Sequence, residues 1–135
     1  MTKISWNKYY QNSEKKNNEN EILLGDFNFI DNENDKANGL NSTDRQVCKT
    51  WLHFLAESNL VDPFRAQTPT RRLWSFIGTG KAKNSRIDRV YVNSENMKNI
   101  TNIKYTPTPF HGHRILTFQV SGREVSTSQV KSILY

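Results

Sequence analysis

The sequence contains a single cysteine, Cys48, and no apolar run that approaches the roughly 20 consecutive residues of a membrane-spanning helix. One cysteine excludes an internal disulfide, and by itself it cannot build a cysteine-ligated zinc site. The chain also lacks the basic start and short apolar run that are typical of a signal peptide. We therefore expect an intracellular protein, nuclear or cytoplasmic, that is neither secreted nor attached to a membrane.

What the sequence does contain suffices for one domain with a modest core, since its 135 residues are 35% hydrophobic and 24% charged. The net charge of +6 conceals two segments of opposite sign. Residues 17–35 carry only acidic charges, whereas residues 71–89 are basic apart from Asp88. Such a separation suits a polyanionic substrate held beside a cation, and the alternative is a set of solvated loops. The candidate substrate-binding side chains are Arg71, Arg72, Lys81, Lys83, Arg86 and Arg89.

Three patterns occupy the first third of the chain. Residues 1–20 carry aromatic side chains at helical spacing and then a polar run, which predicts a helix and a loop. Residues 21–24 are a short apolar run that Gly25-Asp26 stops, as at the end of a buried strand. Residues 28–41 are rich in Asn and Asp, so we expect a loop on the surface.

The best-supported helix begins near Thr43, which has capping-box spacing to Gln46. It should run to about Asn59, because Asp62-Pro63 disfavours a helical continuation. The apolar positions along one face of this helix are Val47, Trp51, Phe54 and Leu55.

The second half of the chain has the pattern of several strands. The segments rich in aromatic and β-branched residues are 73–77, 85–92, 100–105 and 115–120. Within 85–92, alternation predicts that Asp88 shares a face with Val90 and Val92, and that Arg89 shares the other face with Tyr91. The mixed order of elements predicts an α/β protein of the α+β class with mostly antiparallel or mixed strands.

Four polar residues could carry chemistry. Asp26 and Asn28 follow a predicted strand, where a carboxylate can bind a hard cation or polarise water and an amide can donate to a phosphoryl oxygen; the alternative is a strand-terminating turn. Asp88 interrupts a strand, and its alternative role is an ion pair with a neighbouring arginine. His113 precedes the last predicted strand, where it could act as general acid or base or have no chemical role.

The combination of these motifs resembles the endonuclease/exonuclease/phosphatase superfamily, and within it the apurinic-type endonuclease domain of non-LTR retrotransposons. The matching pieces are, in order, Gly25-Asp26-Phe27-Asn28, Leu60-Val61-Asp62-Pro63-Phe64-Arg65, Trp74-Ser75-Phe76, Ser85-Arg86-Ile87-Asp88-Arg89 and His113. The resemblance covers residues from about Ile22 to Val120. It implies the C-terminal half of a four-layer, two-sheet sandwich with outer helices.

By that resemblance, Asp26 orients or deprotonates the attacking water and Asn28 binds the scissile phosphate. Asp88 positions the active-site histidine or supports the metal, and His113 stabilises the transition state or transfers a proton. The resemblance also implies Mg²⁺ or Mn²⁺ as cofactor, with Asp26 and His111 as candidate ligands, and DNA as substrate. Phosphodiester cleavage needs such an activated water and a cation that neutralises charge on the phosphoryl oxygens.

Two departures from the family pattern bear on activity. Gly112 stands where the family has the Asp of a terminal S-D-H motif, and the loss of such a partner can lower a rate by orders of magnitude. The family's N-terminal half, which carries an Asn and a metal-binding Glu, has no counterpart in the sequence. We therefore expect residues 1–20 to be a helix and polar loop, 21–120 a partial domain and 121–135 a polar tail or linker. The expected partners are DNA and either the missing half-domain or a reverse transcriptase region.

Three functions stay open on the sequence. The first is a retroelement-derived, truncated endonuclease that is weak or inactive alone, and the second is a non-catalytic remnant that binds nucleic acid. The third is a hydrolase of a phosphorylated lipid, inositol or small molecule. The basic segment and the motif Ser85-Arg86-Ile87-Asp88 favour nucleic acid over this third function. We also expect half of a sandwich to leave one apolar sheet face exposed, with a tendency to aggregate.

Overall fold

The computed structural model describes residues 22–80, 83–109 and 112–126, so the predicted N-terminal helix lies outside the described residues. The strands are β1 (Ile22–Asp26), β2 (Leu60–Val61), β3 (Asp88–Asn93), β4 (Ile100–Pro107), β5 (Arg114–Val120) and β6 (Arg123–Ser126). The helices are the 3₁₀ turn η1 (Glu33–Asp35), α2 (Ser42–Glu57), α3 (Pro63–Gln67) and the 3₁₀ turn η3 (Ser94–Asn99). No helix in these ranges is long and apolar enough to span a membrane.

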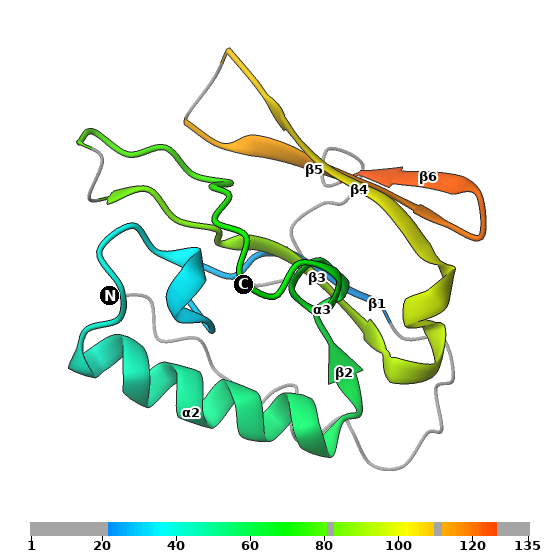
Figure 1. The fold of residues 1–135 in the computed structure, drawn as a ribbon, viewed down its shortest axis with the longest axis horizontal. Helices are drawn as coiled ribbons and strands as arrows, with labels where there is room; N and C mark the ends of the chain where they lie inside the picture. Colours follow the sequence, from blue (N-terminus) through cyan, green and yellow to red (C-terminus); the bar gives the residue numbers. More distant parts are fainter. Residues whose placement is uncertain (1–21, 81–82, 110–111, 127–135) are drawn as a thin grey trace.

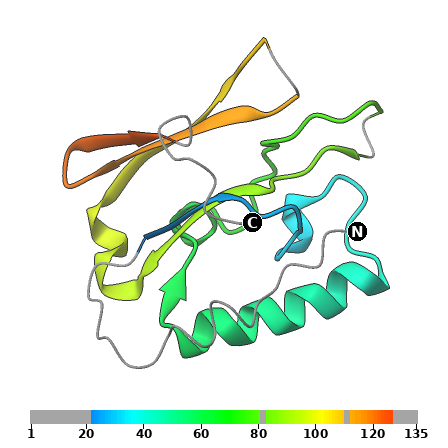
Figure 2. The same cartoon turned by 180° about the vertical axis from the view of Figure 1, so that it is seen from behind.

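The elements form three layers (Figures 1 and 2). Helix α2 lies on one side of a sheet of order β1-β3-β2, and a second sheet of order β4-β5-β6 lies on the other side. Every strand pair in these two sheets is antiparallel. The predicted α+β class with antiparallel strands is therefore confirmed.

Strand β3 is the centre of the fold because both of its faces are buried. Leu24, Val90 and Val92 pack against the second sheet through Leu116 and Phe118. On the opposite face, Tyr91 packs with the α2 side chains in a second cluster whose members are Phe27, Trp51, Leu55, Leu60 and Tyr91. The predicted alternation of faces along this strand is thus confirmed.

The expected exposed apolar face was wrong for the described part of the chain. The second sheet covers the inner face of the first, so Leu116 and Phe118 are fully buried. The exposed large hydrophobic side chains among the described residues are Ile22, Leu52 and Ile77, which lie on β1, on α2 and in the segment after Phe76. They are spread over separate elements instead of lining one sheet.

The ends of the first long helix differ from the prediction by a few residues. The capping box of α2 is made by Asn41 and Asp44, whose side chains each accept from the other's backbone N–H. It is not made by Thr43 and Gln46, because Asn41 caps the helix earlier. Asp62 does not simply end this helix: its side chain caps α3 by accepting from the Arg65 N–H.

Three other segments depart from the expected pattern. Residues 73–77 do not form a continuous strand and make only isolated β-bridges at Phe76. Regular pairing is interrupted because the N–H groups of Ser75 and Phe76 both donate to Ser85 O. Strand β3 begins at Asp88 instead of residue 85, since the preceding N–H groups bind loop and side-chain acceptors. The predicted polar tail begins with a strand, β6, which pairs with β5.

The contact between the two sheets predicts the cost of truncating its side chains. Leu116→Ala should lower the free energy of unfolding by about 2–5 kcal/mol, because it leaves a cavity in a fully buried cluster. Leu52→Ala is the matched control, since Leu52 is 50% exposed and its loss should stay within about 0.5 kcal/mol. Urea unfolding followed by circular dichroism measures both. Equal effects would contradict the packing of the second sheet on the first.

Candidate active site

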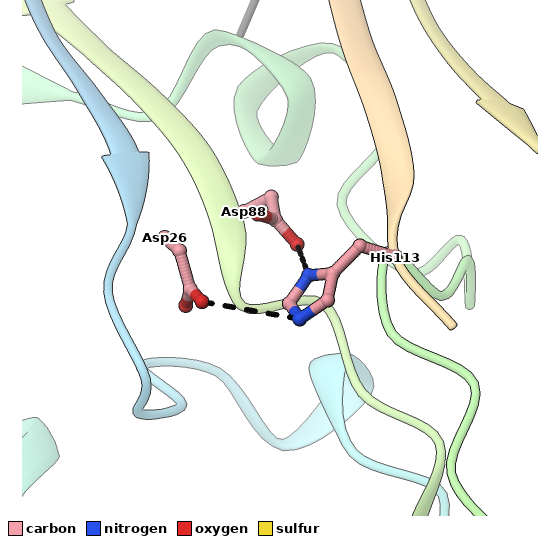
Figure 3. Close-up of side chains that lie close together, drawn as sticks. All are labelled: Asp26, Asp88 and His113. Carbon is pink, nitrogen blue, oxygen red and sulfur yellow. Dashed lines mark hydrogen bonds and ion pairs between the residues drawn. The ribbon is translucent and has the colours of Figure 1, made fainter. Parts of the chain in front are cut away.

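Two antiparallel strands and one loop bring Asp26, Asp88 and His113 together (Figure 3). Asp26 is the last residue of β1 and Asp88 the first of β3, and the two are direct partners in the strand register. His113 immediately precedes β5 in the second sheet. The site therefore lies at one end of the sandwich, where both sheets contribute.

The imidazole of His113 directs one ring nitrogen toward each of the two carboxylates. Its Nδ1 is 3.0 Å from Asp88 Oδ2, and its Nε2 is 4.0 Å from Asp26 Oδ2. An ionised carboxylate can only accept, so Nδ1 carries the proton that Asp88 binds, and in the neutral ring Nε2 is then an acceptor. The side chains of His113 and Asp26 are each 35% exposed and that of Asp88 only 10%, so an incoming molecule meets the first two.

The electrostatics of Asp88 follow from its position behind the histidine. Burial raises the pKa of the Asp88 carboxyl above its ordinary value, hydrogen bonds from His113 and Ser75 oppose that shift, and the charge of Asp26 adds to it. The carboxylate is thus held in a place that disfavours its charge. The expected alternative, an ion pair with an adjacent arginine, does not occur, because its side-chain partner is His113.

Asn28 lies in the turn that follows β1. Its backbone N–H donates to Asp26 Oδ1 at 2.9 Å, and its φ of 55° is in the left-handed region that asparagine tolerates better than most residues. The Asn28 side chain is exposed at the same end of the sheet as Asp26. The turn therefore leaves one oxygen of Asp26 bound to backbone and the other facing His113.

The backbone on both sides of His113 is fixed by the segment around Ser75. Arg114 N–H donates to Ser75 O at 2.7 Å, Ile77 N–H donates to Gly112 O at 2.8 Å, and the Phe76 ring lies 5.0 Å from the imidazole ring. Gly112 has a φ of 70°, and a Cβ there would lie 2.7 Å from Ile77 O. Only glycine therefore fits at position 112, and any side chain there would require a shift of the backbone.

The assignment of Arg86 to substrate binding was wrong, because its side chain is fully buried. Its guanidinium donates to both oxygens of Asp35, at 2.7 and 2.9 Å, and to Asp62. It also donates to the Tyr105 hydroxyl at 3.3 Å, and its face lies over the Phe64 ring. Arg86 is thus the centre of an internal ion-pair network that a nucleic-acid backbone cannot reach.

Arg89 is buried in the same way, so its assignment to substrate binding was also wrong. Its guanidinium donates to the Tyr91 hydroxyl at 2.6 Å and to Phe29 O at 2.6 Å, and it lies 3.9 Å from Asp31. Although burial opposes the effect, Arg89 and the Tyr91 hydroxyl lower the pKa of the Asp31 carboxyl. The acidic segment therefore pairs internally with part of the basic one.

The other described basic candidates remain at the surface. Arg71, Arg72 and Lys83 are exposed, and Arg72 also donates to the carbonyls of Lys36 and Ala37. The chain on either side of Phe76 and Ser85, which are paired by an antiparallel bridge, extends beyond the sheets (Figure 1). Lys81 and the candidate ligand His111 lie outside the described residues.

Two buried hydroxyl groups contact Asp88 and were not singled out from the sequence. Ser75 Oγ accepts from the Asp88 N–H at 2.9 Å, and the Tyr105 hydroxyl donates to Asp88 O at 2.7 Å. A signal for Ser75 was available, because a small polar residue between Trp74 and Phe76 interrupts an otherwise apolar segment. Tyr105 lies on an ordinary aromatic position of a strand, so nothing local marks it.

The chemistry of the donors fits a hard divalent cation at Asp26. Ligand atoms of Asp26, Asp88 and His113 lie within 4.8 Å of one another. Mg²⁺ and Mn²⁺ prefer oxygen donors, and Mg²⁺ keeps several waters and is often bound by only one or two carboxylates. Asp26 is the accessible carboxylate of the group, whereas Asp88 is already engaged with the imidazole.

A second acidic group does not fit a cation in the same way. Asp31, Asp35 and Asp62 also offer ligand atoms within 4.8 Å of one another. Their charges are balanced by the arginines of the ion-pair network, with Arg86 and Arg65 bound to Asp35 and Arg89 near Asp31. This group is therefore a structural one.

The raised pKa of Asp88 predicts how stability changes with pH. The folded state holds the carboxyl proton more tightly than the unfolded state, whose ordinary pKa is 3.8, so ionisation costs stability as pH rises above that value. Asp88→Asn should therefore be at least as stable as the wild type at pH 7, with an advantage that shrinks toward pH 4. Urea unfolding at both pH values measures it. A variant that loses stability at pH 7 and regains it at pH 4 would contradict this account.

Comparisons with known proteins agree with the fold. No known protein-family model matches the sequence. In an alignment 109 positions long that covers 74% of the chain, it is 28% identical to an uncharacterized 149 kDa protein of transposon TX1 from Xenopus laevis, and it spans 8% of that protein.

Two solved structures resemble this one. An AP endonuclease from Leishmania major matches 73% of this chain with a TM-score of 0.59 and 20% identity. A 3′-5′ exonuclease from Neisseria meningitidis matches 77% of it with a TM-score of 0.61 and 20% identity. The chain covers only 34% and 46% of those two structures. The predicted resemblance is thereby confirmed at the level of the fold: the chain carries part of the α+β fold seen in these two structures, as expected from the endonuclease/exonuclease/phosphatase superfamily.

Proposed function

We propose that this chain contributes to the hydrolysis of phosphodiester bonds in DNA, as part of an endonuclease-type site that uses Mg²⁺ or Mn²⁺. The observation that carries the proposal is the pair of contacts made by His113. One ring nitrogen faces the accessible carboxylate of Asp26, and the other binds the buried carboxylate of Asp88. In this arrangement Asp26 can act as a base, His113 can act as an acid when it is protonated, and Asp88 fixes the tautomer of His113. The names of the two similar structures, an endonuclease and an exonuclease, support a nucleic-acid substrate.

Each side chain has a distinct role in this proposal. Asp26 orients or deprotonates the attacking water, because its Oδ2 is accessible and faces His113. Asp88 holds the imidazole in one orientation, and His113 contributes its Nε2 edge to the phosphoryl group, as a donor when protonated. The exposed amide of Asn28 binds a phosphoryl oxygen. A divalent cation held by Asp26 would neutralise charge on the phosphoryl oxygens when bound.

The surface of the site supports a polyanionic substrate. Arg71, Arg72 and Lys83 are exposed on the segments that lead to and from the Phe76–Ser85 bridge, and Phe76 itself also bridges to His113. Duplex DNA carries a dense row of phosphates that such side chains can neutralise. With Arg86 and Arg89 buried, the proposed DNA contact depends on this smaller set.

The chain spans less than half of either similar structure, which supports a site completed by a further segment. The proposed partner is the missing half-domain or a reverse transcriptase region of the same element, consistent with the transposon relative. A second candidate is a remnant that binds DNA without cleaving it. The close contact at position 112 favours that candidate. A Cβ there would clash with Ile77 O, so the Asp of the family's S-D-H motif does not fit without a backbone shift.

The proposed reaction predicts metal-dependent nicking that needs Asp26. Supercoiled plasmid should be nicked in Mg²⁺ and left intact in EDTA when the chain is combined with an N-terminal half-domain that completes the site. Asp26→Asn should lower the rate by about 10²–10⁴, the usual contribution of a positioned base. Glu124→Gln, which changes an exposed carboxylate on β6 in the same way, is the control and should leave the rate unchanged.

The outcomes separate the two candidates. Nicking that Asp26→Asn does not slow would overturn the proposed role of this carboxylate. Binding of DNA without nicking by the wild type combined with that half-domain, in both Mg²⁺ and Mn²⁺, would favour the non-catalytic remnant.

The proposed DNA surface predicts a specific change in salt dependence. The double variant Arg71→Gln, Lys83→Gln should lower the slope of log affinity against log salt by about 1–2, one unit for each lost phosphate contact. The matched control is Lys98→Gln, Lys104→Gln, which removes the same charge from η3 and the outer part of β4. Fluorescence anisotropy with labelled duplex DNA measures both. Equal slopes for the two variants would show that binding follows net charge alone.

A further inference from the structure

Asp88 begins β3 at a point where the neighbouring strand is missing on one side. Ile87 O accepts from the Phe27 N–H, so the backbone groups of Ile87 face β1. Backbone groups alternate between the two edges along a strand. The N–H and C=O of Asp88 therefore point to the edge away from β1. That edge is paired with β2 only at Val92 and Asn93. At Asp88, two side-chain hydroxyls take the place of the strand: Ser75 Oγ accepts from its N–H and Tyr105 donates to its carbonyl.

The direction of the Tyr105 hydrogen bonds is fixed by its partners. The Arg86 guanidinium can only donate, so at 3.3 Å the phenol oxygen accepts from it, and the single hydroxyl proton is left for Asp88 O at 2.7 Å. Burial raises the pKa of the Tyr105 phenol, which keeps this proton in place despite the opposing effect of Arg86. Arg86 is itself held by Asp35 and Asp62.

We propose that Tyr105 is a positioning residue for the Asp88–His113 pair. Its hydroxyl connects the buried ion-pair network to the first residue of β3, and so keeps the Asp88 carboxylate 3.0 Å from His113 Nδ1. Because Tyr105 belongs to β4, it joins the second sheet, whose strand β5 directly follows His113, to the strand that carries Asp88. The catalytic meaning of this role rests on the proposed function, whereas the geometric part does not.

The ring and the hydroxyl of Tyr105 have separate tasks, which allows a clean test. The ring packs edge-on against Phe64 at 5.7 Å and against the core between the sheets. The hydroxyl alone contacts Asp88 and Arg86. Tyr105→Phe therefore keeps the packing and removes only the proposed link.

The test measures the proton on His113 Nδ1 by ¹H–¹⁵N nuclear magnetic resonance of the full chain near neutral pH. In the wild type, the neutral imidazole should carry its proton on Nδ1, bonded to Asp88. In Tyr105→Phe, this population should fall and the Nε2-protonated form should appear. Tyr91→Phe is the control, because it removes a different hydroxyl, that of the fully buried Tyr91 on β3, which binds Asp31 and Arg89 and does not touch Asp88. It should keep the wild-type tautomer.

An activity measurement gives an independent arm. If the wild type nicks DNA in Mg²⁺, Tyr105→Phe should lower kcat roughly tenfold to 100-fold with KM unchanged, as is usual for a residue that supports a reacting group through another. Tyr91→Phe should retain kcat. If the wild type combined with the completing half-domain does not nick DNA, the proposed function fails, while the tautomer experiment still decides the positioning role.

A measurement on the unmodified chain covers the case in which Tyr105→Phe does not fold. The Tyr105 hydroxyl proton should exchange slowly and show cross-peaks to protons of residues 88 and 89. A rapidly exchanging hydroxyl, or a Tyr105→Phe variant that folds and keeps the wild-type tautomer, would overturn the proposal.

Discussion

The buried ion pair between Arg86 and Asp35 is the interaction on which the rest of the site depends. It joins the loop after β1 to the residues that precede β3, and through Asp62 and Tyr105 it reaches α3 and the second sheet. Removing one partner of such a pair leaves a buried charge uncompensated, which is far more destabilising than the pair is stabilising. The network therefore acts as a geometric constraint: each of its members must be in place for the others to be buried.

This constraint explains why the number of charges in each segment did not reveal what the acidic and basic residues bind. Residues 17–35 and 71–89 were expected to bind a cation and a polyanion, each on its own. In the structure, Arg86 and Arg89 instead neutralise Asp35 and Asp31 across more than 50 positions of sequence. Charge patterns report which segments attract, but only the fold decides whether the partner is solvent, substrate or the chain itself.

Local chemistry was predictable where short-range forces decide the outcome. The strand before Gly25, the amphipathic helix and the two faces of β3 were all found where the apolar pattern put them. The residues brought together at the site, Asp26, Asp88 and His113, were also named from their motifs. What the pattern missed depends on long-range contact: residues 73–77 have strand composition, yet Ser75 is used to bind Asp88 instead of extending a sheet.

The conformation of Gly112 has an evolutionary consequence. A Cβ at this position would lie 2.7 Å from Ile77 O, and that same loop is tied by the hydrogen bond from Ile77 to the Gly112 carbonyl. A single codon change to Asp would therefore not recover the acidic residue of the family motif, because the loop would first have to open and release the backbone that holds His113. The glycine is entrenched: the chain can regain that carboxylate only after a compensating change elsewhere, or receive one from a partner.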